Sequence, residues 1–195
     1  LRDGGVWYTR WEYVDRSQVD YHHLWKTNPD GTAQMVYFGN QRPGLLMIDA
    51  KPIPGTEKIV AIFSPGHGRR DHAGSLALID PRLGPDDPDR ARIVQPAQTF
   101  RDPWAFAEDC VIAAQETGIV AVDGAGGAAE IFSLSPEDKA AGFLLHEPRP
   151  IYRRAHGPEI PSRTEPSSEV GRLIVADVYR GRNMGGVAKD EIRRL

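Results

Sequence analysis

The hydrophobic residues of this chain lie in short runs that are separated by turn residues. Apolar, aromatic and β-branched residues come in small groups, and glycine, proline, asparagine or aspartate stands between the groups. This spacing is typical of β-strands, because a helix needs a longer segment with apolar residues at every third or fourth position. We therefore predict strands at 5–15, 23–27, 33–39, 58–64, 74–80, 91–95, 110–115, 118–123, 128–134 and 171–179.

The clearest turn of the sequence lies between the second and third of these segments. It is formed by Asn28, Pro29, Asp30 and Gly31. An Asp-Gly pair between two strands favours a hairpin, since glycine accepts a positive φ at low steric cost. The sequence therefore predicts that 23–27 and 33–39 pair as a β-hairpin.

One segment has the start signals of a helix. Ser135 can cap the first turn, Pro136 fits the first helical position, and two acidic residues follow. We predict one short helix or turn within 135–144. Elsewhere, Asp15, Asp49, Asp80 and Asp123 follow strands or turns, where a carboxylate can cap nearby backbone N–H groups.

Strands that begin with glycine recur along the chain at 74–80, 118–123 and 171–179, and 23–27 occupies the first place in the series. The steps between them are roughly 40–55 residues, which is the range of four-stranded propeller blades. Segments 45–55 and 102–109 can supply the fourth strand of a blade or a connector. The predicted fold is all-β, a partial β-propeller of about three to four blades of antiparallel four-stranded sheet.

The predicted domain organisation is one incomplete propeller domain over 1–195. Within it, 146–170 is rich in proline and should form an extended excursion between strands. The first residue is not methionine and strand patterns begin almost at once, so we expect a fragment of a longer chain. Propellers usually have 4–8 blades. The remaining blades should come from the parent chain or from another copy.

Composition excludes several classes of protein. Net charge is −3 and no long basic stretch exists, which argues against nucleic-acid binding. No apolar run approaches the ~20 residues needed to cross a bilayer. The single cysteine, Cys110, lies in an apolar run and is predicted to be a buried, inert thiol. There is no CxxCH haem-attachment motif.

Several stretches together resemble one known family. They are "YTRWEYVDR", "HHLWKTNPDGT", "PIPGTEKIVAIFSPGHGRRDHAGSLALIDP" and "LIVADVYRG…IRRL". They resemble the middle domain of the hydrazine synthase alpha subunit, a family of six-bladed TolB/WD40-like propeller segments. The run from Pro52 to Pro81 carries the more specific part of this resemblance.

The resemblance implies a shared propeller and an exported, periplasmic protein of planctomycetes or related bacteria. In the family's namesake, the chemistry depends on c-type haems held by flanking domains. Because this sequence has no CxxCH motif, the resemblance implies no cofactor in this segment and no hydrazine synthesis. Haem would belong to flanking domains of the parent chain.

The loop "PGHGRRDHAGS" is the first place to look for chemistry. His67, Asp71 and His72 are suitable ligands for a transition metal, with further ligands from His22, His23 or Glu108. An anion nest of glycine amides with Arg69 and Arg70 is an alternative. The simplest interpretation is a loop whose histidines bond to backbone carbonyls. Similarly, His22 and His23 lie on opposite faces of a strand, and both are expected to have a structural role by packing against neighbouring parts of the fold.

Two function hypotheses follow. The first is a non-catalytic propeller scaffold or interaction module of an exported bacterial protein, next to a haem or redox domain. Its partners would be other blades or domains of the parent chain, or a separate protein. The second is a metal-dependent or redox enzyme domain with its site at the His67/His72 loop. Because no catalytic signature occurs in the sequence, the segment alone is expected not to be an enzyme.

Overall fold

The fold is described here from a computed structural model, which covers residues 3–66, 73–153, 157–171, 174–181 and 184–192. The chain divides into two compact units, 1–163 and 164–195. All the helices and strands among the described residues belong to the first unit. The described residues of the second unit form turns and irregular segments. Across the described ranges, no helix is long and apolar enough to cross a membrane.

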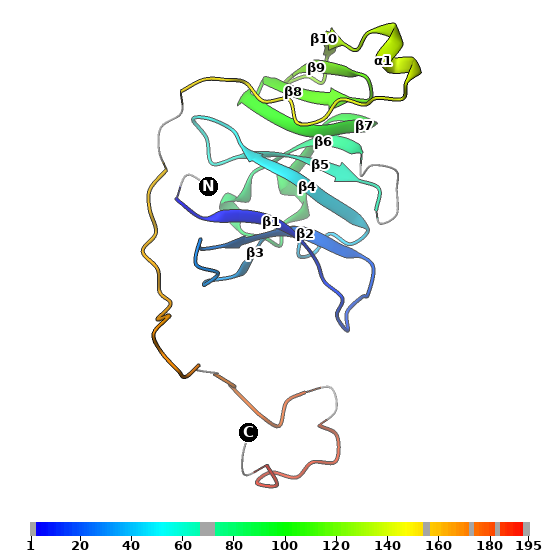
Figure 1. The fold of residues 1–195 in the computed structure, drawn as a ribbon. Coiled ribbons are helices and arrows are strands. Elements are labelled where there is room, and N and C mark those ends of the chain that lie inside the picture. Colours follow the sequence, from blue (N-terminus) through cyan, green and yellow to red (C-terminus); the bar gives the residue numbers. More distant parts are fainter. Residues whose placement is uncertain (1–2, 67–72, 154–156, 172–173, 182–183, 193–195) are drawn as a thin grey trace. The chain divides into compact units, whose positions relative to one another are not determined.

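The first unit is built from strands with one short helix near its end (Figure 1). The strands are β1 (Val6–Trp11), β2 (Tyr21–Thr27), β3 (Met35–Phe38), β4 (Leu45–Pro52), β5 (Ile59–Ser64), β6 (Gly74–Ile79), β7 (Ala91–Ala107), β8 (Cys110–Gln115), β9 (Gly118–Asp123) and β10 (Ala128–Ser133). Two single-turn 3-10 helices, η2 (Pro81–Leu83) and η3 (Pro88–Arg90), lie between β6 and β7. Helix α1 is Pro136–Ala140.

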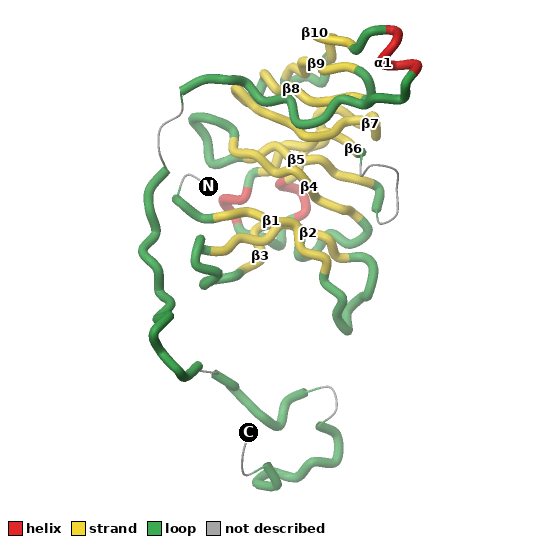
Figure 2. The backbone as a smooth tube through the Cα atoms, viewed as in Figure 1, coloured by secondary structure: helices red, strands yellow, loops and turns green. Residues whose placement is uncertain are grey.

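The described strands form one hydrogen-bonded path in the order β1-β2-β4-β5-β6-β7-β8-β9-β10, with β3 paired to β2 (Figure 2). Neighbours along this path are antiparallel, except that β2 and β4 pair in parallel over two residues. The long strand β7 changes its register to β6 sharply, since Leu76 opposes Gln95 whereas Gly74 opposes Phe100. Residues 91–95 of β7 therefore pair with β6, and residues 100–107 pair with β8.

These pairings define three strand groups. The first group is β1–β3, the middle group is β4–β6 with residues 91–95 of β7, and the third group is residues 100–107 of β7 with β8–β10. In Figure 1 the three groups follow one another from the blue to the green strands. All six residues of β5 are buried, which means that both faces of the middle group are covered.

Two hydrophobic cores lie on the two faces of the middle group. Ile59, Ala61 and Phe63 of β5 pack with Leu24 and Phe38 of the first group, and we call this the first core. Val60 and Ile62 of β5 belong to the second core, which includes residues of the third group: Phe100, Ala105, Val111, Ala113, Val120 and Val122. Successive side chains of a strand point to opposite faces, so a strand can supply two cores only when it is covered on both sides.

The all-β class, the hairpin and the helix are confirmed. Asp30-Gly31 lies in the turn between β2 and β3, where Gly31 has a φ of 81° and donates its N–H to the Asn28 carbonyl at 2.9 Å. Ser135 caps α1 by accepting the N–H of Asp138. Asp80 and Asp123 cap the local turns that follow them.

One expectation about strands was wrong. The described part of 171–179 forms no strand, and the Ile174 side chain is exposed. A strand requires a paired strand for its backbone groups, and the described residues of 164–195 contain no other strand. Residues 91–95 form a strand as predicted, but this strand, β7, runs on without interruption to Ala107 and includes most of 102–109. Consequently the groups are joined in one sheet rather than forming separate four-stranded sheets.

The prediction for Cys110 was also wrong, because this residue is exposed. Cys110 is the first residue of β8 and opposes Asp123 at the last position of β9. It shares a strand face with Ile112, which does not belong to the second core. Apolar neighbours in sequence therefore did not place its side chain in a core.

Candidate functional site

The loop between β1 and β2, residues 12–20, presents large apolar side chains to solvent. Tyr13 is 65% exposed, Val19 is 57% exposed and Val14 is also exposed, as is Trp11, the last residue of β1. The Trp11 and Tyr13 rings meet edge to face with centroids 5.7 Å apart. Solvent-exposed apolar residues gathered in one loop are typical of a surface that another molecule covers.

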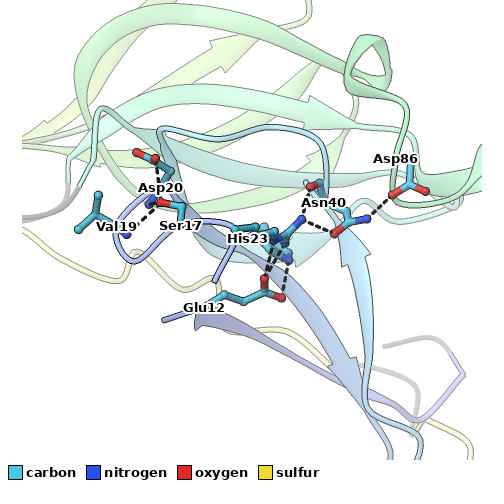
Figure 3. Close-up of polar contacts among 8 residues, drawn as sticks. Glu12, Ser17, Val19, Asp20, His23, Asn40 and Asp86 are labelled. Carbon is cyan, nitrogen blue, oxygen red and sulfur yellow. Dashed lines mark hydrogen bonds and ion pairs between the residues drawn. The ribbon is translucent and has the colours of Figure 1, made fainter. Parts of the chain in front are cut away.

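The loop is held in shape by its own backbone and by short side chains. Val14 and Ser17 exchange two backbone hydrogen bonds of 3.2 Å, and the N–H of Glu12 donates to the Tyr21 carbonyl at 2.8 Å. Ser17 Oγ donates to Asp20 Oδ2 at 2.8 Å and accepts the N–H groups of Val19 and Asp20 (Figure 3). The apolar side chains are thus carried by an ordered backbone.

Arg16 connects the loop to two other parts of the fold. Its Nε and Nη2 donate to Glu12 Oε2 at 3.1 and 2.6 Å, and its Nη1 donates to the backbone and side-chain oxygens of Asn40. Asn40 in turn donates to Asp86 Oδ1 at 2.6 Å (Figure 3). The guanidinium of Arg16 also lies 3.6 Å from the centre of the Tyr21 ring. Charge-assisted contacts of this kind orient the loop strongly.

His22 and His23 lie beneath this loop and are both buried, as the packing hypothesis predicts. The His22 ring stacks on Trp11 at 5.2 Å, and the His23 ring stacks on Trp25 at 5.9 Å. His23 Nε2 is 3.4 Å from Glu12 Oε1. Burial lowers the pKa of His23 below its usual range, although the Glu12 carboxylate acts in the opposite direction. A neutral imidazole at neutral pH suits a packing role.

The structure does not test the predicted metal site. His67, Asp71 and His72 lie outside the described residues. Of the further ligands considered, His22 and His23 pack among aromatic rings, and Glu108 accepts a hydrogen bond from Lys58 Nζ at 2.6 Å. A metal site at the His67/His72 loop therefore stays a prediction.

A group of three acidic residues, which the sequence reasoning missed, lies between the middle and third groups. One carboxylate oxygen from each of Asp49, Asp102 and Glu147 lies within 4.8 Å of the others. Asp102 Oδ2 accepts the N–H of Glu147 at 3.0 Å and is 3.1 Å from His146 Nδ1. Burial raises the pKa of Asp49, and the neighbouring carboxylates of Asp102 and Glu147 raise it further.

Asp49 was expected to cap a local turn, but its carboxylate lies beside those of Asp102 and Glu147, which come from other segments of the chain. All three acidic residues have a positive φ, of 56°, 49° and 48°. Asp49 and Asp102 lie at register shifts of β4 and β7, which sequence periodicity does not reveal. One usable signal was present: Asp102 and Glu147 each follow a basic or imidazole residue and precede a proline.

Comparison with known proteins identified no relative. No family model, curated protein or solved structure matches the chain.

Proposed function

We propose that this chain is a β-propeller segment that serves as a non-catalytic scaffold and interaction module of an exported bacterial protein. On this proposal, the strand groups are successive blades, and the β1–β2 loop binds a protein partner. The periplasmic location and a neighbouring haem or redox domain are parts of the proposal that rest on the family resemblance alone.

The observation that carries the proposal is the burial of both faces of the middle group. Its strands contribute alternate residues to the first core and to the second core, so each face is kept dry by a different neighbour. Each sheet of a propeller is in this situation, because blades stack radially on one another. A two-sheet sandwich would instead leave one face of each sheet in water.

The β1–β2 loop is the part of this scaffold best suited to binding. Hot spots of protein interfaces are rich in tryptophan, tyrosine and arginine, and rigid presentation lowers the entropy lost on binding. Tyr13 and Val19 are exposed on a backbone that the Arg16 contacts hold in place. We therefore propose a protein partner with an apolar patch for this loop.

A site-specific photo-crosslinker tests this proposal. A benzophenone amino acid would replace Tyr13 in the full-length protein, produced in its native bacterium. Met35, which is 52% exposed on β3, supplies the matched control position. We expect one discrete adduct from position 13 and none from position 35. Absence of an adduct at position 13, or the same adducts from both positions, would refute a binding role for the loop.

A further inference from the structure

Three segments of the chain share one local pattern. They are Ile48–Lys51 with the sequence IDAK, Arg101–Trp104 with RDPW, and His146–Arg149 with HEPR. The second residue of each is acidic and has a φ between 48° and 56°, a conformation that L-residues seldom adopt. The first two segments lie in the first strands of the middle and third groups, where the pairing to β5 and β8 shifts register.

The pairing around the first two segments is equivalent residue by residue. Ile48 opposes Ile62 and Lys51 opposes Val60, just as Arg101 opposes Ala114 and Trp104 opposes Ile112. The next strands continue the correspondence, because Ile62 opposes Leu76 and Ala114 opposes Ile119. The residues Val60, Ile62, Leu76 and Leu78 of the middle group therefore correspond to Ile112, Ala114, Ile119 and Ala121 of the third.

The acidic residues also connect each segment to the next. One carboxylate oxygen of Asp49 lies within 4.8 Å of one of Asp102, and the Asp102 carboxylate accepts the N–H of Glu147 at 3.0 Å. Glu147 thus holds the third place in a series of acidic residues whose carboxylates meet. Nearby, the Leu145 N–H donates to the Glu116 carbonyl at 2.8 Å, which fixes this segment to the loop between β8 and β9.

The segment around Glu147 lies where the first strand of another group would lie. Tyr152 meets the Trp104 ring edge to face at 6.5 Å, and the Arg149 guanidinium is 5.3 Å from the centre of that ring. Trp104 opposes Ile112, so it belongs to the face of the third group that points away from the second core. We call this the outer face; it includes Ile112, Ala114, Ile119 and Ala121.

We infer that residues 145–152 are the first strand of a fourth strand group, and that the outer face is the seat for the rest of that group. The occupant is an antiparallel β-sheet with aliphatic side chains at alternate positions, a further repeat of this same kind. This inference rests on the proposed propeller.

Burial supports this assignment. Val60, Ile62 and Leu76 are fully buried and Leu78 is 5% exposed, because the third group covers them. Of their four counterparts, Ile112, Ile119 and Ala121 are only partly buried, whereas Ala114, which opposes Arg101, is fully buried. The interface between the middle and third groups therefore already shows what kind of sheet fits on such a face.

A tandem duplication of residues 108–152, inserted after Tyr152, tests the inference in the full chain. Glu147 corresponds to Asp102, so Tyr152 corresponds to Ala107. The added copy therefore begins with Glu108 directly after Tyr152, just as Glu108 follows Ala107 in the natural chain. The natural Cys110 is changed to serine in both copies. A single Ala121→Cys substitution is then placed in the first copy, or in the second copy as the matched control, and thiol labelling is timed.

In the first copy, the cysteine should react at least about tenfold more slowly than the same cysteine in the natural chain, since labelling would require the added group to open. In the second copy, which forms the new outermost group, it should react as fast as in the natural chain. A duplicated chain that fails to fold, or that labels equally at both positions, overturns the inference. Slow, concentration-dependent labelling of the natural chain would also overturn it by identifying a second copy as the occupant. None of these outcomes affects the crosslinking result at Tyr13.

Discussion

Four isoleucine-to-valine substitutions distinguish a sheet covered on both faces from one covered on a single face. Ile59 and Ile62 lie on opposite faces of β5, and both are fully buried. Ile112 and Ile119 lie on the outer face and are partly buried. Each substitution removes one methylene group, so the chemistry is identical at all four positions.

The expected loss of stability follows from burial. Removing a methylene from a filled core costs about 0.5–1.5 kcal/mol, which includes the cavity that remains. We expect about 1 kcal/mol for Ile59→Val and for Ile62→Val alike. For Ile112→Val and Ile119→Val we expect less than about 0.5 kcal/mol, because water replaces part of the lost contact and no closed cavity forms.

Urea unfolding followed by tryptophan fluorescence measures these differences. With a slope of about 2 kcal/mol per molar urea, a loss of 1 kcal/mol lowers the midpoint by about 0.5 M. An unchanged slope is required for each variant, because a change would mean that the unfolding transition itself had changed. A midpoint for Ile59→Val or for Ile62→Val equal to that of the parent chain would refute burial on that face. A loss at Ile112 as large as at Ile59 would contradict an open outer face in the natural chain.

Two further predictions concern titration. Burial raises the pKa of Tyr37 to about 12. The stability that its neutral phenol contributes is therefore complete below the usual tyrosine pKa of about 10 and is lost as pH rises towards 12. Ultraviolet titration should detect a late-ionising tyrosine that is absent from the Tyr37→Phe variant. Hydrogen bonds from the Arg163 N–H and from Thr32 lower the pKa of Asp30 to about 2. The stability that its ionised carboxylate contributes is therefore present above about pH 4 and is lost as pH falls through about 2. The carboxyl carbon shift of Asp30 in NMR should have its midpoint near 2, and a midpoint near 4 would contradict these contacts.

Local chemistry in the sequence was enough to predict much of the fold. The hairpin at Asp30-Gly31 and the cap at Ser135 depend on residues that are close in sequence, and both form as expected. The β8 and β9 strands match their predicted ranges, because polar turn residues at 108–109 and 116–117 bound β8, and Gly118 and Asp123 bound β9. In each case the determining interactions span only a few residues, so a single sequence contains them.

Features that depend on distant partners were not predicted. Nothing local indicates that β2 pairs in parallel with β4, or that the carboxylates of Asp49, Asp102 and Glu147 meet. The exposure of Cys110 depends on which face of β8 the core occupies, and this is set by the register to β9. A shift of one residue would reverse the faces, so register decides burial where composition cannot.

The two proposals concern separate ends of the hydrogen-bonded path, and this makes them physically independent. The contacts that fix the β1–β2 loop come from Glu12, Asn40 and Asp86, which lie before β7 in the chain. The outer face is formed by β8 and β9, at the opposite end of the path. Substitutions at distant sites without shared partners usually have additive effects. A crosslink at Tyr13 should therefore persist in a chain whose outer face is altered, whereas its loss there would mean that the two ends respond to one common change of structure.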